Sequence, residues 1–311
     1  MFGKIDFRVE DVLACGFTAA LAAFVAVRSA PTEFGLDETH WWDFSFILAP
    51  VSILVFANAV RFAWGGDASD RPSTLASVGA TIRDWLPFLV FSLAYETFRA
   101  EIWRPILSGD RDAGLLRLDR QLFGETPSIL LQRLVRPGLT NAMAAFYFLH
   151  LVLPPFLAVL LYRRHRPLFR EFLLAVLIAG CLGSLGYVIV PATGPGVAFA
   201  HLFAVPLAGS VYDPVARILD VARAPRDVFP SLHVGISTLV LWYGFRRSRT
   251  LGLALLPFVL GNWASTLYLR YHYLVDVFAG WLTAALAAAL ASGLLRLETR
   301  WKSRLERGTV K

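Results

Sequence analysis

Residues 267–277, LYLRYHYLVDV, place Arg270, His272 and Asp276 between two long apolar stretches. Ionisable side chains are costly inside a membrane, so their presence at such a position indicates a function. The flanking stretches, roughly 251–270 and 274–296, are each long enough and apolar enough to span a bilayer. The quoted residues therefore predict a turn between two membrane helices that carries reactive side chains.

The whole chain has the composition of an integral membrane protein. Of its 311 residues, 56% are hydrophobic and 17% are charged, and the mean hydropathy is +0.56. The net charge of +7 comes mostly from arginines at the ends of apolar stretches, so we interpret it as membrane topology and expect no nucleic-acid partner. The sequence predicts an all-α polytopic transmembrane helix bundle of about eight spans, at residues 10–28, 44–64, 85–99, 139–162, 170–190, 231–245, 251–270 and 274–296.

The distribution of arginine predicts which connections face the cytoplasm. Residues 163–170, residues 246–249 and the tail after Arg296 are basic, whereas residues 29–43 are acidic. We therefore expect cytoplasmic N- and C-termini in a plasma membrane, of the bacterial inner-membrane type, with the quoted turn at the extracytoplasmic face.

The chain is expected to form one integral membrane domain with three parts. Residues 1–138 hold the N-terminal spans and an arginine-rich amphipathic outer segment, residues 139–296 hold the later spans and the quoted turn, and residues 297–311 form a basic cytoplasmic tail. The outer segment either lies among lipid headgroups, whose phosphates arginine binds well, or is a solvated loop with self-neutralising charges.

A second histidine is expected at the same face of the membrane. In FPSLHVG, residues 229–235, Ser231 is a suitable N-cap, which places His233 in the first turn of the helix that follows. His272 and Asp276 are four residues apart, so on a helix both project from one face, and the carboxylate can hold one imidazole nitrogen. The other nitrogen is then free to attack.

A phosphorus centre suits this arrangement. His272 as nucleophile would give a phosphohistidine, Asp276 would orient it, and His233 would protonate the departing alkoxide and later activate the acceptor. This route needs no metal and no other cofactor.

The two motifs resemble signature motifs of the type 2 phosphatidic acid phosphatase (PAP2) superfamily. FPSLH and YLRYHYLVD are similar to its second and third motifs, and more narrowly to the branch that contains inositol phosphorylceramide synthase of the aureobasidin-target type. The resemblance covers about residues 139–296 and implies a six-helix PAP2-type core. It also implies His272 as nucleophile, Asp276 as its partner and His233 as acid and base.

The sequence departs from the family pattern where a phosphate would be bound. Thr266 replaces the arginine that commonly follows Ser265, and the first motif, with its Lys and Arg-Pro, is absent between residues 163 and 230. The developing charge of a phosphoryl transition state needs positive donors. Other groups must therefore bind the phosphate and headgroup, and the candidates are Arg270, Arg226, Arg99, Ser231, the backbone at Gly194 and His150.

Three functions remain open from the sequence. The first is a lipid phosphotransferase that moves a phosphoalcohol headgroup, with phosphoinositol as one option, from a phospholipid to a lipid alcohol. The second is a lipid phosphate phosphatase, which completes the same first step with water. The third, from another class, is a transporter or haem-binding bundle, for which His150 lacks an obvious axial mate.

Overall fold

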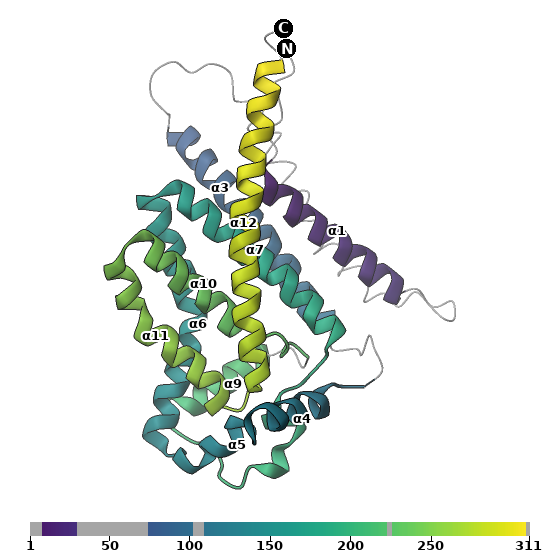
Figure 1. The fold of residues 1–311 in the computed structure, drawn as a ribbon, viewed down its shortest axis with the longest axis vertical. Coiled ribbons are helices and arrows are strands. Elements are labelled where there is room, and N and C mark those ends of the chain that lie inside the picture. The colour runs from purple at the N-terminus through teal and green to yellow at the C-terminus, as the bar shows by residue number, and fades with distance from the viewer. Residues whose placement is uncertain (1–7, 30–73, 102–108, 223–225, 309–311) are drawn as a thin grey trace. The chain divides into compact units, whose positions relative to one another are not determined.

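The computed structural model describes residues 8–29, 74–101, 109–222 and 226–308, and every regular element within these ranges is a helix. This confirms the all-α expectation; the predicted span at 44–64 lies outside the described residues. The elements, shown in Figure 1, are α1 (Val9–Ser29), α3 (Thr74–Glu101), α4 (Asp112–Phe123), α5 (Pro127–Leu131), η2 (Gln132–Leu134), α6 (Pro137–Arg164), α7 (Arg166–Ile189), α8 (Pro195–Ala198), η3 (Ala200–Leu202), α9 (Tyr212–Ala222), α10 (Leu232–Arg247), α11 (Arg249–Tyr268) and α12 (Leu274–Gly308).

Four of these helices are long and apolar enough to cross a membrane: α6, α7, α11 and the part of α12 from Leu274 to Arg307. Together they confirm a membrane helix bundle. Helix α10 has 16 residues, fewer than the roughly 20 that a full crossing needs, which agrees with the short span expected there. The total of eight crossings remains a prediction.

The chain divides into two compact units, Met1–Glu101 with Ser292–Lys311, and Ile102–Ala291. Within the first, α1 and α3 pair through aromatic rings, with the centroids of Phe17 and Phe91 4.8 Å apart. A buried ion pair between Asp11 and Arg83 adds a polar link between the same two helices. The first unit is thus held by its own aromatic and ionic contacts.

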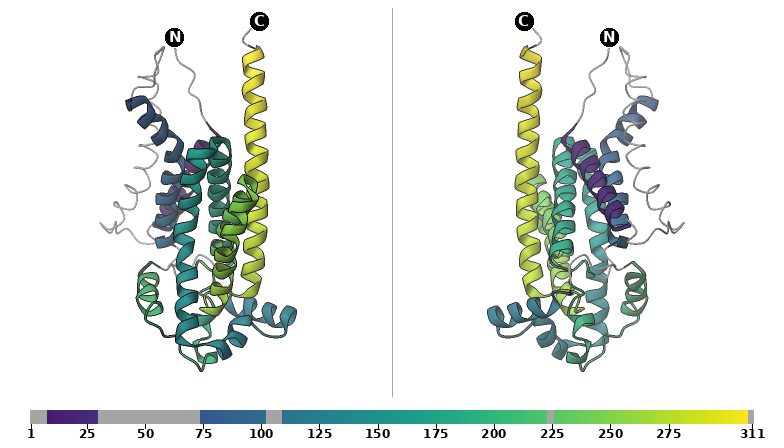
Figure 2. Two further views of the ribbon diagram at one scale, coloured as in Figure 1. Left: turned by 90° about the vertical axis from the view of Figure 1, so that its left-hand side faces the viewer. Right: turned by 90° about the vertical axis from the view of Figure 1, so that its right-hand side faces the viewer.

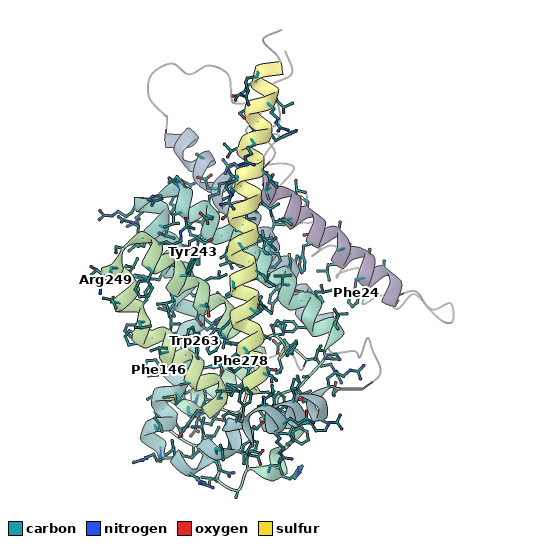
Figure 3. All side chains as sticks on the ribbon, in the orientation of Figure 1. Phe24, Phe146, Tyr243, Arg249, Trp263 and Phe278 are labelled. Atoms are coloured by element: carbon teal, nitrogen blue, oxygen red, sulfur yellow. The ribbon has the colours of Figure 1, made fainter. Side chains whose placement is uncertain are left out.

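The second unit is a bundle of α6, α7, α10, α11 and the first part of α12, with α4, α5 and α9 at one end (Figures 1 and 2). Helix α10 packs against α6, α7 and α11. Trp263 of α11, labelled in Figure 3, donates a hydrogen bond to Ser237 of α10 at 2.9 Å. Its ring packs edge-on against Trp281 of α12, with the ring centroids 5.2 Å apart. Such polar and aromatic contacts stabilise helix pairs in a membrane, where apolar burial alone gives little preference for one partner.

Two glycines make room for the segment that begins α10. A Cβ at Gly186 of α7 would lie 2.9 Å from the Phe229 carbonyl oxygen, and one at Gly280 of α12 would lie 2.5 Å from the Ser231 carbonyl oxygen. Real side chains avoid such distances, so both helices approach residues 229–231 more closely than any larger residue allows. This contact fixes where His233 enters the bundle.

Gly280→Ala is expected to lower the melting temperature of the purified protein, because overpacking a close backbone contact costs about 1–3 kcal/mol. Gly114→Ala in α4 is the matched control, since a Cβ there meets nothing within 4 Å. Thermal unfolding in detergent compares the two. Equal melting temperatures for both variants would contradict the close contact.

Candidate functional site

The turn between α11 and α12 reverses the chain in five residues. The Thr266 carbonyl accepts hydrogen bonds from the backbone N–H groups of Tyr271 at 3.0 Å and His272 at 3.1 Å. Arg270 adopts a left-handed conformation, with φ 65°, which is uncommon for a residue with a side chain. The predicted span began at residue 274, and α12 does begin at Leu274, so Asp276 is helical while His272 lies in the turn just before the helix.

His272 and Asp276 nevertheless meet. The distance from His272 Nδ1 to Asp276 Oδ2 is 3.5 Å, and the two side chains are 3% and 0% exposed. Asp276 Oδ2 also accepts a hydrogen bond from the Tyr273 N–H at 2.8 Å, as an acidic third residue of a helix does in a capping box. The carboxylate is therefore fixed by the start of its own helix and directed at the imidazole.

Three histidines from three elements gather at this point. The His233 ring, in the first turn of α10, lies 5.7 Å from the His272 ring and 4.3 Å from the His150 ring of α6, measured between centroids. Tyr147, three residues before His150 on the same helix, stacks on His233 at 4.4 Å, and its hydroxyl lies 3.5 Å from His233 Nδ1. The structure thus brings together His272, Asp276, His233 and His150.

Ser231 joins the two motifs through its backbone and caps α10 through its side chain. Its N–H donates to the Asp276 carbonyl at 3.2 Å, and its hydroxyl accepts from the Val234 N–H at 3.3 Å. The N-cap prediction is confirmed. Because the hydroxyl is fully buried and used by the helix, its geometry favours a positioning role over substrate contact.

The Arg270 side chain is directed at residues 203–205, which follow η3. Its Nη2 donates to the Val205 carbonyl at 2.5 Å, its guanidinium lies 4.3 Å from the centroid of the Phe203 ring, and its own carbonyl accepts from the Gly196 N–H at 2.9 Å. Burial lowers the pKa of the guanidinium. Among the described residues, Nε has no hydrogen-bond partner and no carboxylate pairs with this cation, so its charge is not neutralised.

The other predicted binding residues lie elsewhere or have protein partners. Arg226 pairs with Asp110, Nε to Oδ1 at 2.6 Å. The Gly194 N–H donates to Asp112 Oδ1 at 2.9 Å, so it is directed at a carboxylate and not at an open phosphate position. Arg99 belongs to α3 in the first unit, and its side chain is outside the described residues.

Sequence analysis missed two buried acids on α4. Asp119 accepts hydrogen bonds from the N–H groups of Leu274 and Val275, each at 2.9 Å. Asp112 accepts from the Thr193 N–H and from the Tyr273 hydroxyl, also at 2.9 Å. They are seven residues apart, on the face that also buries Leu115 and Leu116. Acids on the apolar face of an amphipathic helix are the signal that could have revealed them.

Tyr273 joins this acid pair to the histidine turn. Burial, together with the neighbouring Asp112 carboxylate, raises the pKa of its phenol, so the hydroxyl stays protonated and donates. Its backbone N–H meanwhile donates to Asp276. One residue thus contacts both the α4 acid and the partner of His272.

Comparison with known proteins gives two matches. The family model of the PAP2 superfamily matches residues 113–290, more than half of the chain. The chain is also similar to phosphoinositol dihydroceramide synthase of Bacteroides thetaiotaomicron, with 26% identity over 228 residues that cover 63% of this chain and 71% of that one. No solved structure matches the chain. The family match begins within α4, so it includes Asp119 but begins one residue after Asp112.

Replacing Ser231 separates a capping role from a substrate-binding role. Ser231→Ala should destabilise the protein by about 1 kcal/mol, whereas Ser231→Gly should cost only a few tenths, because glycine is tolerated at an N-cap. Thermal unfolding of both variants measures the difference. Unchanged stability in both, with an equal loss of turnover, would instead assign the hydroxyl to substrate.

Proposed function

Because the chain belongs to the PAP2 superfamily and is thus a membrane enzyme of the lipid phosphatase and phosphotransferase class, we propose that it is a headgroup transferase. It moves a phosphoalcohol from a phospholipid to the hydroxyl of a second lipid, without a metal or other cofactor. The observation that carries this proposal is the meeting of His272, Asp276 and His233 in one cluster.

In the first half-reaction, Asp276 faces Nδ1 of His272 and favours the tautomer with the proton on that nitrogen. The lone pair of Nε2 attacks the phosphorus, an N–P bond forms, and the P–O bond to the donor lipid breaks. The leaving alkoxide takes a proton from His233. General acid catalysis of this kind contributes about 10²–10⁴-fold.

In the second half-reaction, neutral His233 accepts the proton of the incoming lipid hydroxyl. That oxygen bonds to phosphorus, the N–P bond breaks, and His272 returns to its starting state. The stacked Tyr147 ring and the adjacent His150 ring support this role, because they limit how far the His233 imidazole can turn.

Arg270 is the proposed source of positive charge for the phosphoryl group. It lies in the same turn as His272, and within the described chain no carboxylate neutralises it. A desolvated, preorganised cation stabilises developing charge more strongly than a solvated one. Arg226 is a weaker candidate because Asp110 already pairs with it.

The proposed location is the extracytoplasmic face of a bacterial plasma membrane, with both termini in the cytoplasm. Helices α6 and α10 begin at the end of the bundle that carries α4 and α5, so the basic turns that follow them, at 163–166 and 246–249, lie at the other end (Figure 1). Basic turns favour the cytoplasmic side.

The name of the similar Bacteroides protein supports transfer over hydrolysis and supports a phosphoinositol donor. The donor is accordingly proposed to be a phosphoinositol lipid and the acceptor a lipid alcohol. Hydrolysis by water is the competing outcome.

The test uses purified protein in detergent with EDTA, a headgroup-labelled phosphoinositol lipid and a ceramide-type lipid alcohol. Wild type should move label to the acceptor, and His272→Ala should reduce transfer at least about 10⁴-fold because it removes the nucleophile. His201→Ala, which changes an exposed histidine in η3, is the matched control. Activity abolished by chelator, or release of the label into water, would overturn the proposal.

A further inference from the structure

The contacts of α4 suggest a role for Asp119 that the family resemblance did not indicate. Its two carboxylate oxygens receive the N–H groups of two consecutive residues, Leu274 on Oδ2 and Val275 on Oδ1. Thr126 adds a hydroxyl hydrogen bond to Oδ2 at 2.7 Å. With 0% exposure, this carboxylate is satisfied only by protein donors.

These two N–H groups belong to the first residues of α12, which have no acceptor within their own helix. A buried helix start needs such acceptors, and an anion there also interacts favourably with the helix dipole. Asp119 therefore fixes the position at which α12 begins. Asp276, in the first turn of that helix, and His272, just before it, are fixed by the same contacts.

Asp112 holds the other side of the same turn. Its carboxylate accepts the Tyr273 hydroxyl and also the N–H groups of Thr193 and Gly194, which follow α7. Helix α4 thus contacts the start of α12 through Asp119. Through Asp112 it also links Tyr273, just before α12, to the residues that follow α7. Both acids lie on one face of a single helix of 12 residues.

We propose that Asp119 is a positioning residue for the reaction: as a bidentate clamp on Leu274 and Val275, it sets the geometry between His272 and Asp276. This rests on the proposed function of these two residues. Asp119 touches neither substrate nor the reacting atoms. Its effect reaches the phosphorus through the placement of the nucleophile, for which a shift of about 1 Å can cost 10²-fold in rate.

The principal variants are Asp119→Asn and Asp119→Ala, and the matched control is Glu125→Gln. Glu125 lies in the same segment, but its partners are Arg120, at 2.8 Å, and the Thr126 N–H, with no bond to α12. We expect kcat to fall about 100-fold in Asp119→Ala and less in Asp119→Asn, which keeps one acceptor oxygen. KM for the donor lipid should stay within about threefold, and the control should match wild type.

A double-mutant cycle tests whether Asp119 acts through the His272 and Asp276 pair. In an Asp276→Asn background, Asp119→Asn should cost little further activity, because residues that act as one unit are not additive. An equal fold loss in both backgrounds, or a rise in KM with unchanged kcat, would overturn the proposal.

Hydrogen–deuterium exchange provides a measure that needs no turnover. Peptides covering residues 269–280 should exchange about tenfold faster in Asp119→Ala than in wild type or Glu125→Gln, since the amides of Leu274 and Val275 both lose their acceptor. Unchanged exchange would refute the clamp even if the protein proved inactive as a transferase. An inactive wild type with the expected exchange would instead refute only the proposed function.

Discussion

Buried N–H groups at the start of α12 need acceptors, and the site depends on how that need is met. Asp276 accepts from Tyr273, and Asp119 accepts from Leu274 and Val275. Two fully buried carboxylates therefore satisfy three consecutive donors. Because a buried unsatisfied amide costs about 1–3 kcal/mol, the chain has few alternatives for where this helix begins. The position of His272 follows from this arrangement.

A second constraint brings the other histidine to the same place. Gly186 and Gly280 allow residues 229–231 to lie against α7 and α12, and the Ser231 N–H donates to the Asp276 carbonyl. The backbone of one motif is thus bonded to the backbone of the other. His233 is held near His272 by main-chain contacts, while Tyr147 and His150 of α6 limit the orientation of its ring.

Local patterns in the sequence predicted much of this site. The all-α membrane class followed from composition, the cap at Ser231 followed from its position before an apolar run, and the approach of His272 to Asp276 followed from their spacing. The burial of Asp119 could have been inferred from its place on the apolar face of α4, but its partners on α12 are 155 and 156 residues away, and no local pattern reports that contact. Gly194 was considered for phosphate because the glycines of residues 191–196, PATGPG, permit close approach to the backbone, yet its N–H donates to Asp112. His150 was a candidate for headgroup binding because it lies within an apolar span, but only the fold places it beside His233.

The most direct test of the account is to find where the enzyme is modified during turnover. Purified protein mixed with labelled donor lipid and no acceptor, quenched in alkali to preserve phosphohistidine, would be digested and sequenced by mass spectrometry. The account predicts a headgroup–phosphoryl adduct on His272 that is absent in His272→Ala and that forms more slowly in His233→Ala, which lacks the acid for the leaving alkoxide. An adduct on His233 or His150, or turnover without any histidine adduct, would contradict the assignment of His272 as nucleophile.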